Sequence, residues 1–197
     1  MIVVVTGATG AAGRAVCARL GERGDTVIAV GTDAGRLSGV DADERRVADL
    51  TDPDAVRALA ADLGRVDAVL HLVGGWKPGD SPEADAWLRP RLVDTLANVV
   101  EAFEPALAAS EGRLAIVSST AVRPDDEQAS SYARAKAEAE ELVAELGDRL
   151  AVDGGAATVF VIGSLGEEGT PAAVLAERLS AWLAADADAV NGARLTV

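Results

Sequence analysis

The sequence predicts a doubly wound α/β fold, in which helices cover both faces of a parallel β-sheet. Short apolar runs alternate along the chain with segments of helical periodicity, as in "VVVTGATGAAGRAV" near the start. The 197 residues are 49% hydrophobic and only 3% aromatic, which favours aliphatic strands and closely packed helices. This length suits one hydrophobic core, so we expect residues 1–197 to form a single domain.

Strands are expected wherever a short run of aliphatic residues is bounded by polar residues or glycine. Runs that are apolar throughout, without alternation, are typical of strands buried on both faces of a parallel sheet. The connections between such strands are right-handed crossovers, usually helices. We expect strands at residues 2–6, 26–30, 45–50, 67–75, 112–119, 156–163 and 193–197.

Helices are expected between these strands, and several of their ends carry recognisable residues. Gly24 is suited to end the first helix, and Asp52 followed by Pro53 is typical of an N-cap and a first helical residue. By the same argument Thr170 is expected to cap the last helix and Pro171 to begin it. The helices expected span about residues 11–23, 53–64, 84–109, 130–150 and 171–185.

The charge of the chain excludes several function classes. A formal net charge of −14 at pH 7 would repel nucleic acid and anionic membrane surfaces, so any anionic ligand must be held locally. No apolar run approaches the roughly 18 residues needed to span a bilayer. No basic leader precedes the first strand. We therefore expect a cytoplasmic protein without nucleic-acid or membrane partners.

The chain has one cysteine, Cys17, and one histidine, His71. A single cysteine allows neither an internal disulfide nor a thiolate metal cluster, and its place in an expected helix indicates a buried core residue. A single histidine excludes the usual histidine metal sites. We expect no metal, and we interpret His71 as a structural residue.

Three glycines follow the first strand at intervals of three residues: Gly7, Gly10 and Gly13. Glycine lets the backbone approach a pyrophosphate closely, and the N-terminus of the helix that follows favours negative charge. Tight packing alone is the alternative explanation. The position after the first strand of an alternating α/β chain favours nucleotide binding, because ligands bind at the carboxyl ends of such strands.

A second motif, "YARAK", places Tyr132 and Lys136 on one face of a helix. An ammonium group beside a phenol favours the phenolate and lowers its pKa from about 10. Such a pair is also common on solvated helices. Ser119 ends the fifth strand thirteen residues earlier and adds a hydroxyl at the same edge of the sheet, which favours a catalytic site.

Together these motifs resemble the short-chain dehydrogenase/reductase family. "TGATGAAG", "DL" at 49–50, "VGG" at 73–75, "IVSS" ending at Ser119 and "YARAK" follow that family's order and approximate spacing over essentially the whole chain. The resemblance implies a three-layer Rossmann domain with strand order 3-2-1-4-5-6-7. It also implies hydride transfer between a nicotinamide cofactor and a small carbonyl or alcohol.

The resemblance assigns roles to particular residues. Tyr132 would act as general acid or base, Lys136 would lower its pKa and hold the nicotinamide ribose, and Ser119 would polarise the carbonyl. Thr95 aligns best with the asparagine that often completes the family's catalytic tetrad. The cofactor would further contact residues of the glycine turn, the adenine end and the nicotinamide end: Gly7, Thr9, Gly10, Ala12, Gly13, Asp49, Leu50, Val73, Gly74, Ile162 and Gly163.

The chain departs from the family pattern at several positions. Ala11 stands where the commoner glycine pattern has a glycine, and residues 71–74 replace the Asn-Asn-Ala-Gly segment. Thr95 in place of asparagine puts the proton relay in doubt, and Asn98 would replace it only in another helical register. Only "SLGEEGT" separates Gly163 from Pro171, so we expect a shortened substrate lid and an open site, or one completed by another subunit.

The end of the second strand bears on the form of the cofactor. An acidic residue there would bond the ribose of NAD, but this chain has Gly31 and Thr32, and Asp33 comes too late. Arg36, Arg45 and Arg46 lie near the expected adenosine end, where they are either a solvated surface or partners of a 2′-phosphate. We prefer NADP to NAD, with Thr32 and Arg36 among the binding residues.

The leading functional hypothesis is an NAD(P)-dependent oxidoreductase acting on a small carbonyl or alcohol. A dinucleotide-binding regulator or scaffold with weakened catalysis is the first alternative, and an enzyme similar to sugar-nucleotide epimerases or dehydratases is the second. The alanine-rich helices at about 84–109 and 130–150 resemble the family's usual four-helix contact. We therefore expect a homodimer or homotetramer.

Overall fold

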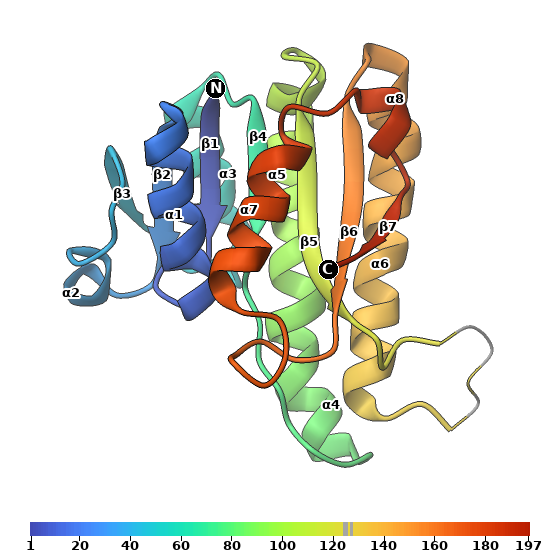
Figure 1. Ribbon diagram of the computed structural model, residues 1–197. Helices are drawn as coiled ribbons and strands as arrows, with labels where there is room; N and C mark the ends of the chain where they lie inside the picture. Colours follow the sequence, from blue (N-terminus) through green and yellow to red (C-terminus); the bar gives the residue numbers. More distant parts are fainter. Residues whose placement is uncertain (124–125, 127) are drawn as a thin grey trace.

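The computed structural model describes residues 1–123, 126 and 128–197. In this part of the chain seven strands form one sheet, every neighbouring pair is parallel, and the order is β3-β2-β1-β4-β5-β6-β7 (Figure 1). The predicted doubly wound fold and its strand order are confirmed. The strands are β1 (Ile2–Thr6), β2 (Thr26–Gly31), β3 (Glu44–Val47), β4 (Ala68–His71), β5 (Arg113–Ser119), β6 (Ala156–Ile162) and β7 (Arg194–Thr196).

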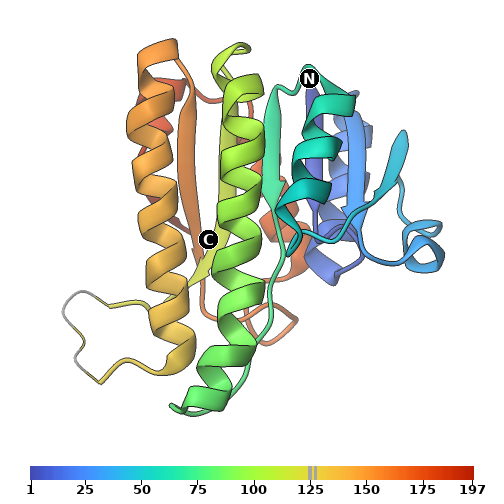
Figure 2. The same ribbon diagram turned by 180° about the vertical axis from the view of Figure 1, so that it is seen from behind.

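Helices α1 and α7 cover one face of the sheet, and α3, α5 and α6 cover the other (Figures 1 and 2). Because successive side chains of a strand point to opposite faces, Val4 of β1 packs in one core cluster and Val3 and Val5 in the other. The principal helices are α1 (Ala11–Arg23), α3 (Pro53–Leu63), α4 (Pro82–Arg89), α5 (Thr95–Ala108), α6 (Ser131–Leu150) and α7 (Ala172–Trp182).

The helix expected at residues 84–109 is divided into three parts. Helix α4 gives way at Pro90 to a π-helical segment, Pro90–Asp94, and α5 follows. Proline has no N–H to donate, and its ring conflicts with the preceding turn of an α-helix, so the ladder of backbone hydrogen bonds changes register there. Pro105 lies inside α5, which continues past it to Ala108.

Several predicted boundaries are wrong. Pro171 is the N-cap of α7, and Thr170 is not. The backbone N–H of Thr170 donates instead to the backbone oxygen of Ser164, in the segment before the helix. Strand β4 ends at His71 instead of residue 75, β3 spans 44–47 instead of 45–50, and α7 ends at Trp182 instead of Ala185. Two helices of four residues were not predicted: α2 (Ala34–Leu37) and α8 (Ala187–Val190).

Other predicted helix ends are confirmed. The Asp52 carboxylate accepts from two backbone N–H groups at the start of α3, and Gly24 ends α1 with a φ of 86°. Ser130 caps α6 by accepting from the backbone N–H of Ala133 at 3.3 Å. This last cap fixes the start of the helix that carries Tyr132 and Lys136, at the carboxyl edge of the sheet.

Candidate active site

A cavity of about 760 Å³ lies beyond the carboxyl ends of β4, β5 and β6. This volume is in the range of small-molecule sites. Eight residues predicted from the sequence line it: Ala12, Val73, Gly74, Ser119, Tyr132, Lys136, Ile162 and Gly163. The other predicted site residues lie outside its lining: Gly7, Thr9, Gly10, Gly13, Thr32, Arg36, Asp49, Leu50 and Thr95.

The three predicted catalytic side chains meet in this cavity. Ser119 ends β5, and Tyr132 and Lys136 lie one turn apart near the start of α6, which packs against β5 and β6. Ser119 Oγ accepts from the backbone N–H of Ala121 at 3.1 Å. Residues distant in sequence are thus brought to one point.

The Lys136 ammonium group is buried, with 7% of the residue exposed. Its Nζ donates to the backbone oxygen of Val117 on β5 at 2.7 Å. Burial lowers the pKa of Lys136 to about 8, because the charged form loses its hydration, and the Glu140 carboxylate acts in the opposite direction. Lys136 therefore remains mostly charged at pH 7.

Burial raises the pKa of Tyr132 above its usual value, and the Ser119 hydroxyl opposes this shift. The direction is opposite to the lowering by Lys136 that the sequence predicts. The physical reason is that the phenol is desolvated, while the Lys136 ammonium group directs its hydrogen bond to Val117. The Tyr132 phenol is therefore protonated near neutral pH, as a proton donor must be.

The glycine turn is packed tightly at two of its three glycines. Gly7 has a φ of +69°, and a Cβ there would lie 2.6 Å from the backbone oxygen of Leu72, just after β4. A Cβ on Gly13 would collide with the backbone of Gly7. Gly10 is different, since a Cβ would meet only the oxygen of Gly7, at 3.4 Å. Packing thus explains Gly7 and Gly13, and open space lies beside Gly10.

Arg14 braces the glycine turn, a role the sequence analysis missed. Its guanidinium donates to the backbone oxygens of Thr9 at 3.3 Å, Arg36 at 2.9 Å and Gly39 at 2.5 Å. These contacts tie the turn after β1 to the segment that follows β2. Contacts to backbone oxygens leave no signal in a sequence pattern. The one clue in the sequence to the role of Arg14 is its position directly after Gly13.

The three arginines near the end of β2 differ in what they contact. Both Nε and Nη2 of Arg45 donate to the Val40 oxygen, and Arg46 pairs with Glu44 at 2.6 Å and Asp62 at 3.2 Å. Arg36 is exposed, and its contacts are made by its backbone. Within this group, Arg36 therefore differs from Arg45 and Arg46, whose guanidinium groups are bonded to the protein.

The position expected to hold an acidic residue in NAD-specific relatives is closely packed. A Cβ on Gly31 would lie 3.3 Å from Thr9 Cγ2 and 3.4 Å from the Leu37 side chain. Thr32 and Asp33 follow and are exposed, and the Asp33 carboxylate caps α2 by accepting from the N–H of Arg36 at 2.8 Å. The carboxylate of Asp33 is thus already engaged as a helix cap.

Asp49 and Leu50 follow β3 instead of belonging to it. Asp49 is exposed and accepts from the backbone and hydroxyl of Thr51, which lowers its pKa. Leu50 is a buried core residue, and its backbone oxygen accepts from Asn98 Nδ2 at 2.9 Å. Asn98 thus braces the segment after β3 and does not line the cavity beside Tyr132.

Thr95 belongs to a buried polar chain behind the cavity. His71 Nδ1 lies 2.9 Å from Thr6 Oγ1, and its Nε2 lies 3.4 Å from Thr95 Oγ1, which itself donates to the Arg91 oxygen. Burial lowers the pKa of His71 to about 3, so the ring is neutral. These contacts of His71 link the ends of β1 and β4 to α5, which is a structural role.

Residues 3–185 match the model of the NAD dependent epimerase/dehydratase family. The chain belongs to this family. Part of the chain is also similar to a 3beta-hydroxysteroid dehydrogenase of Mediterraneibacter gnavus, at 35% identity over 103 residues. That match covers 45% of this chain and 37% of the relative.

Solved structures show the same fold across the whole chain. A short-chain dehydrogenase/reductase from Vibrio parahaemolyticus has a TM-score of 0.86 at 19% identity, covering 100% of this chain and 98% of that one. An oxidoreductase of that family from Burkholderia thailandensis has a TM-score of 0.85 at 22% identity, covering 100% and 90%. The resemblance to short-chain dehydrogenases/reductases is confirmed.

The glycine turn of this epimerase/dehydratase family member fits the pyrophosphate of a dinucleotide. No side chain caps the N-terminus of α1, and its first turn holds no acidic residue, so its N–H groups are available to an anion. The open side of Gly10 leaves room for close approach of a phosphate. Ala12, the second residue of α1, lines the cavity that holds Ser119 and Tyr132.

Two apolar side chains flank the mouth of the cavity. Trp76 follows β4 and is 68% exposed, and Leu165 follows β6 and is 42% exposed. The short segment after β6 folds back on itself, with the Gly166 N–H donating to the Thr170 oxygen at 3.0 Å. This segment, 164–170, is the stretch for which the sequence predicts a shortened substrate lid.

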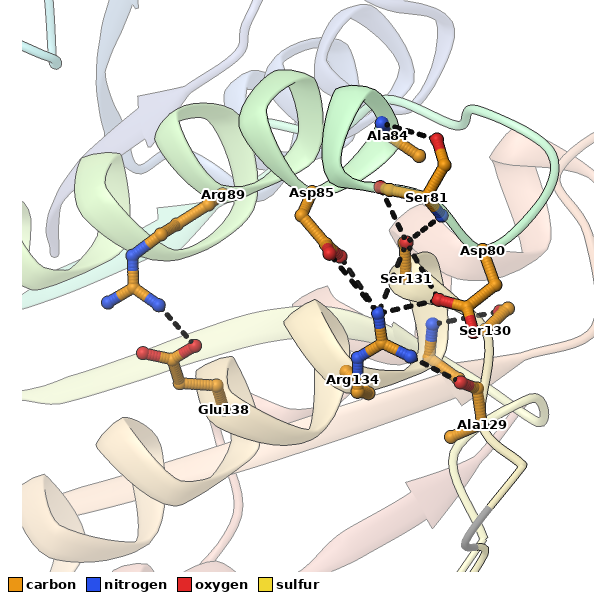
Figure 3. Close-up of polar contacts among 11 residues, drawn as sticks. Asp80, Ser81, Ala84, Asp85, Arg89, Ala129, Ser130, Ser131, Arg134 and Glu138 are labelled. Carbon is orange, nitrogen blue, oxygen red and sulfur yellow. Dashed lines mark hydrogen bonds and ion pairs between the residues drawn. The ribbon is translucent and has the colours of Figure 1, made fainter.

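The segment that carries Trp76 is tied to the start of α6 by polar contacts (Figure 3). Arg134 Nη2 donates to Asp80 at 2.7 Å and to Asp85 at 3.0 Å, and its Nη1 donates to the Ala129 oxygen at 2.7 Å. Ser131 is buried and lies between the two elements, with its Oγ 3.3 Å from Asp80. One wall of the cavity and the helix bearing Tyr132 are therefore held together.

Within the described residues, no helix is both long and apolar enough to cross a membrane. The same part of the chain contains no group of three His, Cys, Asp or Glu side chains that could hold a metal ion. Cys17 is buried in the core, where burial raises the pKa of its thiol to about 12. Its thiol is therefore protonated at neutral pH.

Proposed function

We propose that this family member transfers a hydride between NAD(P) and a small carbonyl or alcohol. The observation that carries the proposal is the meeting of Ser119, Tyr132 and Lys136 in one cavity beside the glycine turn. The name of the hydroxysteroid dehydrogenase relative describes the same reaction class, and its similarity supports the proposal.

The side chains divide the work of carbonyl reduction. The Tyr132 phenol, protonated because of its raised pKa, donates its proton to the carbonyl oxygen, and the Ser119 hydroxyl donates a hydrogen bond to that oxygen. The Lys136 ammonium group stabilises the phenolate that remains. The nicotinamide, when bound, supplies the hydride. In alcohol oxidation the phenolate takes the proton instead.

We propose NADP as the preferred cofactor, and NAD as the alternative. Gly31 leaves no carboxylate at the end of β2 to reject a 2′-phosphate. The exposed Arg36 guanidinium, on the short helix after β2, would pair with that phosphate, and Thr32 would lie beside it. Asp49 and Leu50 would border the adenine, and Gly7, Thr9 and Gly13 would shape the turn.

An epimerase or dehydratase acting on a sugar nucleotide is a second candidate, favoured by the description of the matched family. Such a reaction returns the hydride to the substrate, so the cofactor is unchanged after each cycle. A regulator or scaffold that binds the dinucleotide without useful turnover is a third. The unusual Thr95 and the short 164–170 segment motivate the regulator hypothesis. Thr95 stays a predicted catalytic residue only in the oxidoreductase hypothesis.

The predicted homodimer or homotetramer through α4–α5 and α6 belongs to the same proposal. The surface of these helices carries ion pairs between Arg89 and Glu138 and between Arg149 and Glu104. Larger apolar side chains that are exposed in the described chain lie on other elements. An interface here would therefore be polar, and light scattering at two salt concentrations tests it.

A cytoplasmic location is proposed as well, in keeping with the lone buried Cys17.

The test compares the parent protein with Tyr132→Phe. NADPH and NADH binding is measured by fluorescence titration, and turnover is measured on a panel of small aldehydes, ketones and alcohols. The proposal predicts equal cofactor binding in both proteins and turnover in the parent alone. Equal binding with no turnover of any substrate in the parent would instead support the regulator.

A further inference from the structure

Glu140 lies one helical turn beyond Lys136 on α6 and uses both of its carboxylate oxygens. Ser118 Oγ, on β5, donates to Glu140 Oε1 at 2.5 Å. Arg194 Nε, on β7, donates to Glu140 Oε2 at 2.9 Å. The Glu140 side chain is only 15% exposed, so this carboxylate is held in a fixed place between helix and sheet.

Arg194 extends the same network to the end of β5. Its Nη2 donates to the backbone oxygens of Ser119 and Val122, each at 3.2 Å. Strand β7 pairs with β6 and not with β5, so Arg194 reaches across β6 to make these contacts. The backbone that presents the Ser119 hydroxyl is thereby attached to the Glu140 carboxylate.

The charge of Lys136 depends on what surrounds it. Helix α6 contributes Tyr132 and Glu140, and β5 contributes Ser118. His71 of β4 is neutral because of its lowered pKa, and Arg194 of β7 is paired with Glu140. Among the described residues, Glu140 is the acidic group that raises the pKa of Lys136 against the effect of burial. An ammonium group buried without such a partner would tend to lose its proton.

We propose that Glu140, fixed by Ser118 and Arg194, is a positioning residue that supplies the counter-charge of the Lys136 ammonium group. Its carboxylate keeps Lys136 charged while Nζ binds the Val117 oxygen, and Arg194 holds both the carboxylate and the end of β5. The catalytic meaning of this arrangement rests on the proposed function. The electrostatic coupling between Glu140 and Lys136 does not, and it is measured separately.

The chain is well suited to that measurement, because Lys77 and Lys136 are its only lysines. Lysine labelled with ¹³C and ¹⁵N gives one side-chain signal for each, and their chemical shifts are followed from pH 6 to pH 11 in the folded protein. Lys77, outside α6, is the internal reference. The variants are Glu140→Gln, its neighbour Glu141→Gln as a matched loss of one exposed charge, and Arg194→Gln.

We expect the pKa of Lys136 to be about 8 in the parent. In Glu140→Gln it falls by about 1, the usual effect of removing a nearby opposite charge. In Glu141→Gln it stays at the parent value. In Arg194→Gln it stays or rises, because a positive charge has been removed while Ser118 still holds the Glu140 carboxylate in place. If the network had only a structural role, the pKa of Lys136 would instead change in the same direction in Glu140→Gln and in Arg194→Gln.

An unchanged Lys136 titration in Glu140→Gln overturns the proposal, and so does an equal fall in Glu141→Gln. If Glu140→Gln does not fold, Arg194→Gln decides, since a fall in the pKa of Lys136 there contradicts the counter-charge. The titration needs neither cofactor nor substrate. A parent protein without turnover therefore refutes the proposed function alone, and an active parent with an unchanged titration refutes this inference alone.

Discussion

The Lys136 ammonium group donates its hydrogen bond to the backbone oxygen of Val117, at 2.7 Å, from a buried position. The cation of Lys136, one helical turn from Tyr132 on α6, is thus fixed by a strand that also ends in Ser119. This relationship orients the candidate catalytic group through the backbone of β5, and it has consequences for stability as well as for chemistry.

The buried Lys136 should make stability depend on pH. Its pKa is about 8 in the folded protein and 10.5 in the unfolded chain, so the unfolded state binds more protons between these values. The free energy of unfolding therefore rises with pH over that window. Below pH 8 the destabilisation caused by burying the Lys136 ammonium group is fully present. Relative to Lys136→Met, the parent should gain about 2 kcal/mol between pH 7 and pH 10.

Urea unfolding of both proteins at the two pH values measures this difference. The comparison cancels the contribution of groups other than Lys136, because they are common to both proteins. A difference in the free energy of unfolding that is the same at pH 7 and pH 10 would show that Lys136 is not desolvated in the folded protein.

Two glycines at the start of the chain should respond in opposite directions to the same substitution. Gly7→Ala should lower the free energy of unfolding by about 1–3 kcal/mol, because its positive φ and the Leu72 oxygen exclude a Cβ. Gly21→Ala should raise it by up to about 1 kcal/mol, because this position is in α1 and has nothing within 4 Å. Equal effects in urea unfolding would contradict the packing described for the turn.

Arg36→Ala should weaken NADPH binding by about tenfold or more, the value of one charge-assisted hydrogen bond, and leave NADH binding unchanged. Arg46→Ala is the control, because its guanidinium is already paired with Glu44 and Asp62. Calorimetric titration measures the dissociation constants of NADPH and NADH for the parent and for each variant. Parent binding that is tighter for NADH than for NADPH would reverse the preferred cofactor.

Arg134→Gln should have little effect on stability, below about 1 kcal/mol, because its ion pairs with Asp80 and Asp85 are exposed. Its effect should appear instead in the segment between β4 and α4, which loses its attachment to α6. Hydrogen exchange by mass spectrometry over residues 74–82 measures this, and unchanged protection there would mean that other contacts hold the segment.

The fold follows from local patterns, which is why it could be predicted. Buried parallel strands such as β1 are continuous apolar runs, and Asp52 with Pro53 marks a helix start by its own chemistry. The errors arose where distant contacts decide. Thr170 forms a backbone bridge with Leu165 and does not cap α7.

The candidate site divides in the same way. Ser119, Tyr132 and Lys136 could be found because strand ends and helix periodicity place side chains at a known edge. Arg14 and Arg194 could not, because both act on backbone oxygens of remote segments. The raised pKa of Tyr132 was also beyond the sequence, since burial is a property of the folded chain.

The most direct test of the central claim follows the hydride itself. The parent protein is given NADPH carrying deuterium at C4 of the nicotinamide, on the transferred face, together with any carbonyl that it turns over, and the product is analysed by mass spectrometry. The account predicts one deuterium on the carbinol carbon of the parent's product, and a rate about 10²–10⁴-fold lower with Tyr132→Phe. Product formed without deuterium, or product formed equally fast by Tyr132→Phe, would contradict it.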